Sequence, residues 1–409
     1  MSDREFTGFH VDTVAEAVRQ PPLADLRTAA RSRRRQRTTG FAVAAVVMAG
    51  LVVTPLFGGS NGSGWAGPDQ PPAGPARAGE VVLTSRDSGV AVIRMECALL
   101  FSHSVDEGRS WSDWDAARYE AESCPTNSAG NRNADLEYAV LSNGIYLVRD
   151  GERDLLSTDH GRTWQDADEA TVPVADFPKR ARPVFCQQGC AAVREPLAVD
   201  DATSTVYRLT GKSPSSYPPF SIYPAVDGSI WVTYWPGEAA QPIVARSADR
   251  GASWVSWRPQ AGADVVAVLG VDAREGYLLI QATPPPGSTV PTGPARLLRT
   301  TDGARTWADT GTDLPATQQI PFLTIGADGA VLVPFAFADT PDLSAKLLVS
   351  RDGGRHFTVS RDYRAQEGTG AVAPGLAWLY GRDDPSDTGP DHVIVTTDGT
   401  TWKRFALPH

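Results

Sequence analysis

The chain has 409 residues, of which 41% are apolar and 21% are charged. It is too long for one ordinary hydrophobic core and too apolar to be disordered, so a repeat architecture is the first possibility to test. The formal net charge is −10, and residues 41–409 hold 43 acidic against 30 basic residues, which argues against nucleic-acid binding.

An N-terminal basic tail, residues 1–40, precedes an uncharged apolar run at residues 41–57. The run has 17 residues, near the lower limit for a helix that spans a bilayer. Five arginines lie just before it, between residues 31 and 37. Because Lys and Arg concentrate on the cytoplasmic side, we expect a single-pass transmembrane helix with the N-terminus inside the cell. The alternative is a cleaved signal peptide, although the segment ahead of the run is long for one.

Part of the tail, PPLADLRTAARSRR from residue 21, is expected to form a short helix. Its Pro pair fits the start of a helix, and its apolar residues recur at helical spacing. Such a basic helix either binds a cytoplasmic partner or is attracted to anionic lipid. Residues 58–79 are rich in Gly and Pro and should form a flexible tether. Residues 80–409 are then expected outside the cytoplasm. All four cysteines lie in this part, which suits an oxidising exterior.

From residue 80 onward one pattern of eight residues returns, with the spelling Ser/Thr-x-Asp-x-Gly-x-Ser/Thr-Trp. The copies, which we call the repeated turns, are SVDEGRSW (104–111), STDHGRTW (157–164), SADRGASW (247–254), TTDGARTW (300–307), SRDGGRHF (350–357) and the shorter TTDGTTW (396–402). The pattern is typical of a strand, a turn and a second strand.

Each part of the pattern has a physical role. The aspartate can accept hydrogen bonds from backbone N–H groups of its own turn, the glycine permits a positive φ, and the aromatic ring should fold back over the turn. The residues concerned are Asp106, Trp111, Asp159, Trp164, Asp249, Trp254, Asp302, Trp307, Asp352, Phe357, Asp398 and Trp402. The fourth copy, where Gly303 and Ala304 stand in swapped order, and the shortened last copy should differ in geometry.

The repeated turns resemble the Asp-box, or BNR repeat, of sialidases and related β-propellers. The resemblance implies an all-β propeller over residues 80–409. The aspartates of the copies are 53, 90, 53, 50 and 46 residues apart, so one unit without a repeated turn is expected in the long interval.

A second set of glycine turns supports this count. These turns contain Gly89, Gly144, Gly189, Gly228, Gly276, Gly329 and Gly375. A period of 40 to 50 residues with several short strands is typical of four-stranded propeller blades. We therefore expect seven blades, with six as the alternative, and STVYRLTGK (204–212) as the third strand of the unit that lacks a repeated turn.

In such antiparallel blades both sets of turns lie on one face, and the remaining loops lie on the other. The loops at 283–295, 337–345 and 382–391 are the longest, so we expect any ligand on that second face. Alternatively, these proline-rich loops are tolerated insertions. Cys186 and Cys190 flank the glycine turn of the third unit and should form a disulfide, and Cys97 and Cys124 should form another on the second face.

An enzymatic function must be considered, because sialidases carry this repeat. A family sialidase also has an Arg-Ile-Pro motif, three substrate-binding arginines, a Tyr and Glu nucleophile pair and an Asp acid. Arg-Ile-Pro is missing from the sequence, and nothing in the spacing of Arg149, Arg153, Arg182 and Arg299 selects a triad. No catalytic residue is therefore predicted.

Metals and cofactors are not predicted either. One aspartate in each turn, without further acidic ligands, is better explained by bonds to its own backbone than by calcium. The six histidines have no zinc-site spacing.

The sequence thus favours a cell-surface binding module that recognises an extracytoplasmic protein or glycan. The alternatives are a divergent sialidase-like glycoside hydrolase and a sensor that reports through its basic tail.

Overall fold

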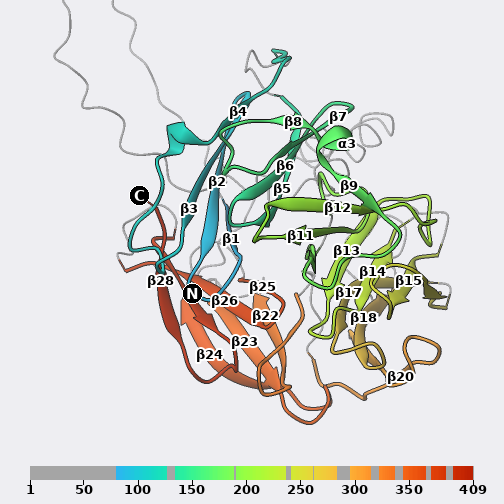
Figure 1. Cartoon of the computed structure of the whole chain (residues 1–409). Coiled ribbons are helices and arrows are strands. Elements are labelled where there is room, and N and C mark those ends of the chain that lie inside the picture. Colours follow the sequence, from blue (N-terminus) through green and yellow to red (C-terminus); the bar gives the residue numbers. More distant parts are fainter. Residues whose placement is uncertain are drawn as a thin grey trace, which may run out of the picture. The chain divides into compact units, whose positions relative to one another are not determined.

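The computed structural model describes residues 80–126, 134–187, 190–235, 241–260, 262–282, 295–314, 322–336, 344–364, 370–383 and 390–408. Within them the chain is all-β, and its strands form seven four-stranded sheets, consistent with a seven-bladed β-propeller (Figure 1). The expected tail (1–40), membrane segment (41–57) and tether (58–79) lie outside the described residues. The described helices, η1 (Trp114–Ala116) and α3 (Ala167–Ala170), are too short to cross a bilayer.

Six of the sheets share one plan, in which four consecutive strands pair antiparallel in chain order. The first two of these sheets are β1 (Glu80–Leu83), β2 (Gly89–Met95), β3 (Ala98–Ser104) and β4 (Arg118–Glu120), then β5 (Leu136–Ser142), β6 (Ile145–Asp150), β7 (Arg153–Ser157) and β8 (Gln165–Asp166). The fourth and fifth are β13 (Pro219–Pro224), β14 (Ile230–Tyr234), β15 (Ile243–Ser247) and β16 (Val255–Trp257), then β17 (Ala263–Gly270), β18 (Gly276–Ala282), β19 (Arg296–Thr300) and β20 (Ala308–Asp309). The last two are β21 (Thr324–Ile325), β22 (Val331–Ala336), β23 (Ser344–Ser350) and β24 (Thr358–Arg364), then β25 (Ala371–Ala373), β26 (Leu376–Gly381), β27 (His392–Thr396) and β28 (Lys403–Ala406).

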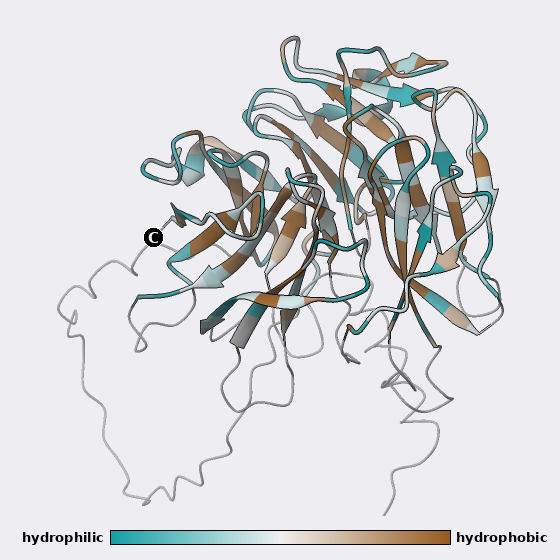
Figure 2. Cartoon of the chain, turned by 90° about the horizontal axis from the view of Figure 1, so that it is seen from below, coloured by the Kyte–Doolittle hydropathy of each residue, from teal (hydrophilic) through white to brown (hydrophobic). Residues whose placement is uncertain are grey.

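The middle strands are buried on both sides, because each sheet packs between two others. All five residues of β14 and all five of β15 are buried, although they include Thr233, Arg246 and Ser247. Such strands read as continuous apolar runs instead of alternating patterns. Hydrophobic residues accordingly follow the strands and hydrophilic ones gather at the turns (Figure 2).

Two ends of these six sheets can be distinguished. The connections between first and second strands and between third and fourth strands share one end, which we call the turn face, and all repeated turns lie there. The connections between second and third strands lie at the opposite end, the loop face. Most of the three long loops expected to bind a ligand falls on residues 283–294, 337–343 and 384–389, outside the described residues.

The third sheet follows a different plan. It consists of β10 (Arg182–Pro183), β11 (Leu197–Asp200), β12 (Thr205–Leu209) and β9 (Val172–Val174). The expected third strand, β12, is present, but the outermost strand β9 precedes the other three in the chain and pairs parallel to β12. No repeated turn follows β12 to lead into an antiparallel fourth strand, so an earlier segment occupies the outer position.

Successive sheets contact one another around a closed ring (Figure 1). One contact from each junction, in order from the first and second sheets, is Arg94 to Leu136, Arg182 to Leu141, Phe177 to Arg250, Trp231 to Asp272, Thr310 to Gly354, Arg351 to Asp398 and Ala406 to Glu107. The last of these joins the seventh sheet to the first. All strands of those two sheets come from their own ends of the described chain, so the ring closes without strand exchange.

Candidate functional site

The structure shows what the residues shared by the repeated turns do, and the first copy is representative. Asp106 Oδ1 accepts hydrogen bonds from the Ser110 amide (2.9 Å) and the Ser104 hydroxyl (2.9 Å), and Oδ2 accepts one from the Ser110 hydroxyl (2.7 Å). The Ser104 hydroxyl oxygen in turn accepts from the Gly108 amide at 3.0 Å. The Ser110 bonds, which favour the charged carboxylate, lower the pKa of Asp106 to about 2.

Two consecutive residues of each eight-residue copy adopt a left-handed backbone. In the first copy they are Glu107 (φ 67°) and Gly108 (φ 78°), and in the fourth they are Gly303 (φ 75°) and Ala304 (φ 68°). The expectation that the fourth copy differs in geometry is therefore wrong, because Ala304 takes the left-handed conformation that glycine takes elsewhere. The last copy does differ, since it has one left-handed residue, Gly399.

The aromatic residue of each copy packs against the preceding sheet as well as closing its own turn. Trp111 Nε1 donates to the Ala406 carbonyl (3.3 Å) in the seventh sheet, and Trp164 Nε1 donates to the Arg118 carbonyl (3.2 Å) in the first. Trp307 packs on Trp231 of the fourth sheet, with ring centroids 6.1 Å apart. The repeated turns thus connect neighbouring sheets through their aromatic residues, while their aspartate carboxylates bond within the turn.

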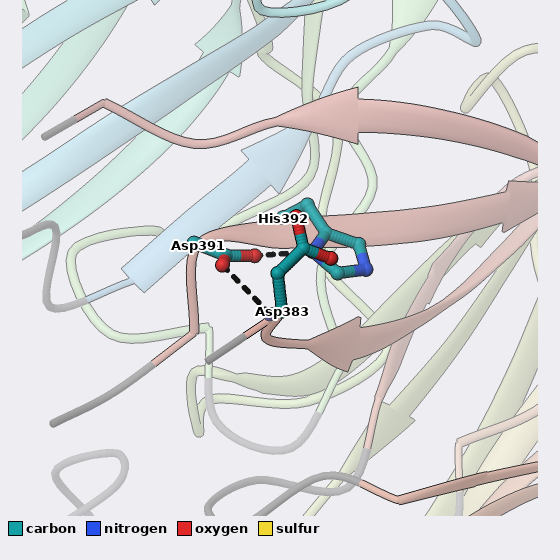
Figure 3. A group of neighbouring side chains, drawn as sticks. All are labelled: Asp383, Asp391 and His392. Carbon is teal, nitrogen blue, oxygen red and sulfur yellow. Dashed lines mark hydrogen bonds and ion pairs between the residues drawn. The ribbon is translucent and has the colours of Figure 1, made fainter. Parts of the chain in front are cut away.

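The strongest polar cluster lies instead on the loop face, at the start of β27 (Figure 3). We call Asp383, Asp391, His392, Tyr363 and Arg404 the rim cluster. His392 is 1% exposed, its Nδ1 contacts Asp391, and its Nε2 lies 2.5 Å from the Tyr363 hydroxyl of the sixth sheet. This chain of contacts requires glycine at 381, where a Cβ would lie 2.1 Å from the Tyr363 ring.

Asp383, Asp391 and His392 are the one group of three possible metal ligands found among the described residues. Arg404 already binds both oxygens of Asp383, at 2.9 and 2.7 Å, and lies 3.8 Å from Asp391. A bidentate guanidinium supplies the positive charge that a cation would bring. The rim cluster is therefore better described as an Asp–His–Tyr hydrogen-bonded chain, with an Arg–Asp pair beside it, than as a metal centre.

A second group, the inner cluster, consists of Glu80, Arg94 and Tyr138. Tyr138 of β5 donates its hydroxyl to Glu80 of β1, and the Arg94 guanidinium lies 5.8 Å from the Tyr138 ring centroid. Desolvation raises the pKa of the Glu80 carboxyl, although the residue keeps an exposed surface, and the Tyr138 hydrogen bond and the Arg94 charge oppose that shift. Acidic, cationic and phenolic groups from the first two sheets therefore meet near the inner strands on the loop face.

Aromatic side chains gather on the same face at the fourth sheet. Phe220 of β13 and Trp235, which follows β14, lie with ring centroids 5.5 Å apart. Tyr217, just before β13, is 46% exposed. We call these three residues the aromatic group; Tyr217 is exposed, and Phe220 and Trp235 are half-buried.

The four cysteines form the two expected disulfides, Cys97–Cys124 and Cys186–Cys190. The first links the β2–β3 connection to the segment after β4. The second does not staple a tight hairpin, because β10 ends at Pro183 and β11 begins only at Leu197.

The four arginines considered for a substrate triad do not converge. Each is bound to its own acidic partner: Arg149 to Asp154, Arg153 to Glu122, Arg182 to Asp201 and Arg299 to Glu275. The inner cluster was missed because Glu80 and Tyr138 are 58 residues apart and no motif marks them. The repeat spacing is the available signal, since it brings the first strands of consecutive sheets side by side.

The chain matches no protein-family model and no curated protein. Similar solved structures include an ulvan lyase of polysaccharide lyase family PL25, at 11% identity and a TM-score of 0.43, covering 80% of this chain and 90% of that one. They also include a GH74 enzyme of Niastella koreensis (12%, TM-score 0.33, 78% and 63%) and YCF48 bound to a D1 peptide (13%, TM-score 0.32, 80% and 80%). Likeness at this level carries no argument about function.

Proposed function

We propose that this protein is a membrane-anchored, extracytoplasmic binding module of the Asp-box type that recognises a glycan through its loop face. The observation that carries the proposal is the aromatic group, with Tyr217 exposed and Trp235 beside Phe220. Sugar rings have apolar C–H faces that stack on aromatic side chains and hydroxyl groups that bond to charged ones. Binding sites commonly combine an aromatic lining with a few placed polar groups.

The other parts of the proposal have separate support. The six repeated turns share a sequence pattern. In each of them the aspartate accepts a hydrogen bond from a backbone N–H group of its own turn, which supports an Asp-box assignment. The membrane anchor is supported by the apolar run at residues 41–57 and the arginines before it. A protein ligand and a sensor role for residues 1–40 are the competing proposals.

The inner cluster favours a second candidate, a divergent sialidase-like glycoside hydrolase. Tyr138 and Glu80 are hydrogen-bonded, which is a Tyr and Glu pairing of the kind that the sialidase resemblance requires. A single arginine, Arg94, accompanies them among the described residues, where that resemblance asks for three. Binding without turnover is therefore the first proposal and hydrolysis the second.

One experiment separates the two candidates. The full-length chain, purified in detergent, is applied to an immobilised glycan panel and, in parallel, to aryl glycosides and a sialoside. We expect retention of at least one glycan without hydrolysis, and about ten-fold weaker binding in the Trp235→Ala and Tyr217→Ala variants. Val226 lies on the turn face and is 93% exposed, so the Val226→Ala variant is the control and should bind the glycan normally.

Two outcomes contradict binding without catalysis. Retention of no glycan, or unchanged binding by both aromatic variants, would remove the loop face as a glycan site. Turnover that is lost in Glu80→Gln would replace the binding module with the hydrolase.

A further inference from the structure

The segment between β10 and β11, residues 184–196 with 188–189 undescribed, has a position that the blade plan does not explain. We call it the crossing segment. Phe185 packs against three separate hydrophobic clusters, which are built from the fourth to sixth, the sixth and seventh, and the seventh and first sheets. A residue that follows the inner strand β10 can contact all three clusters only where the sheets meet, near the axis of the ring.

Hydrogen bonds tie the crossing segment to distant sheets. The Cys186 amide donates to the Ile222 carbonyl (3.0 Å) and the Ile222 amide donates to the Cys186 carbonyl (2.8 Å), so the crossing segment pairs with the inner strand β13. Gln187 Nε2 donates to the Leu323 carbonyl at 2.9 Å, beside β21 of the sixth sheet. The segment thus links the third sheet to the fourth and across the ring to the sixth.

The Cys186–Cys190 disulfide lies within this linked part. Cys190 is 4% exposed, whereas Cys186 is only half-buried, so a thiolate can reach Cys186 Sγ more easily. The bridge joins residues four apart in sequence, against 27 for Cys97–Cys124. Because the effect of a disulfide on the unfolded chain grows with loop length, the short bridge contributes less to global stability and acts mainly on local conformation.

We propose that the Cys186–Cys190 disulfide is a redox-sensitive lock that holds the crossing segment at the axis of the ring. An external dithiol is the reductant. Its thiolate attacks Cys186 Sγ, the S–S bond breaks and Cys190 leaves as a thiolate that takes up a proton. The second thiol of the reductant then displaces Cys186. Two electrons pass to the protein, which gains two thiols, and the reductant becomes a disulfide.

Release of the lock frees the contacts made by Phe185, Cys186 and Gln187, while the seven sheets remain folded. The Ile222 amide reports this directly, because its partner is the Cys186 carbonyl. The inference is independent of the ligand and of the proposed function.

Hydrogen exchange measured by mass spectrometry tests the lock. The full chain carrying Cys97→Ser and Cys124→Ser retains a single disulfide, which is compared oxidised and after dithiothreitol, with alkylation and mass measurement to verify reduction. We expect exchange in peptides covering 219–224 and 322–325 to become about ten-fold faster on reduction, with β2 and β3 unchanged. The Cys186→Ser/Cys190→Ser variant, with the long disulfide intact, should exchange like the reduced form.

Equal exchange at 219–224 in the oxidised and reduced forms would overturn the proposal. So would a disulfide that resists dithiothreitol under conditions that reduce Cys97–Cys124 in the wild type. If a variant fails to fold, the oxidised and reduced wild-type chains give the same comparison, because Cys97–Cys124 belongs to the first sheet and residues 219–224 form β13 of the fourth.

Discussion

Two left-handed glycines of the repeated turns, Gly108 and Gly353, have different surroundings. Gly108 and Gly353 have the same φ of 78°, so any side chain at either position meets the same backbone strain. Their surroundings differ, because a Cβ on Gly108 would lie 1.9 Å from the Ala406 carbonyl oxygen, whereas one on Gly353 would lie 3.3 Å from the flexible Arg299 guanidinium. Ala304, which is fully buried at φ 68°, shows that strain alone is tolerated.

This difference predicts unequal costs for the same substitution. Gly353→Ala should lower the free energy of unfolding by about 1 kcal/mol through backbone strain. Gly108→Ala should lower it by about 3 kcal/mol or more, because overpacking against Ala406 adds to the strain. Urea unfolding followed by tryptophan fluorescence measures both variants. Equal losses would mean that the contact with the seventh sheet is relaxed at no cost.

At the scale of the elements, the junction between the seventh and first sheets combines apolar packing with surface charge. Trp111 packs edge-on against Phe405, with ring centroids 5.9 Å apart, and donates to Ala406. Lys403 lies 2.8 Å from both Asp87 and Glu107. Exposed ion pairs contribute little, whereas removal of a packed ring leaves a cavity.

Closure of the ring should therefore depend on Trp111 more than on Lys403. We expect Trp111→Ala to reduce the free energy of unfolding by about 2 kcal/mol or more. Lys403→Ala should have no measurable effect, and added salt should change the wild type little. Thermal unfolding at low and high ionic strength checks this. A larger loss for Lys403→Ala than for Trp111→Ala would contradict it.

The sequence predicts those elements whose bonds are local and misses those that depend on distant partners. Six of the seven sheets follow from hairpins such as 300–307, in which Asp302 bonds to Thr306 four residues away, and the seventh follows from the long interval between two copies and from the second set of glycine turns. The pairing of β9 with β12 has no such signal, because the strands are separated by other elements and joined by no turn. The rim cluster likewise depends on Tyr363, which belongs to the sheet before His392.

At the scale of the whole molecule, the repeated aspartates couple folding to pH. All six have a lowered pKa in the folded chain, and for Asp106 it falls to about 2. For Asp106 and Asp302 the main causes are hydrogen bonds from Ser110 and Thr306, which the unfolded chain does not make. A folded state that holds fewer protons than the unfolded state loses stability as the pH falls.

The sign and range of the effect follow from these directions. The stabilisation is complete above the ordinary carboxyl pKa of about 4 and is lost as the pH falls through about 2. We expect the melting temperature to be nearly flat between about pH 5 and pH 6 and to fall steeply below about pH 4. In Asp106→Asn the amide cannot ionise, so this variant should be less stable than the wild type near neutral pH, and the difference should shrink toward about pH 2. A constant difference between the two proteins over that range would show that the Asp106 carboxylate keeps an ordinary pKa and that the repeated turns hold their shape without its charge.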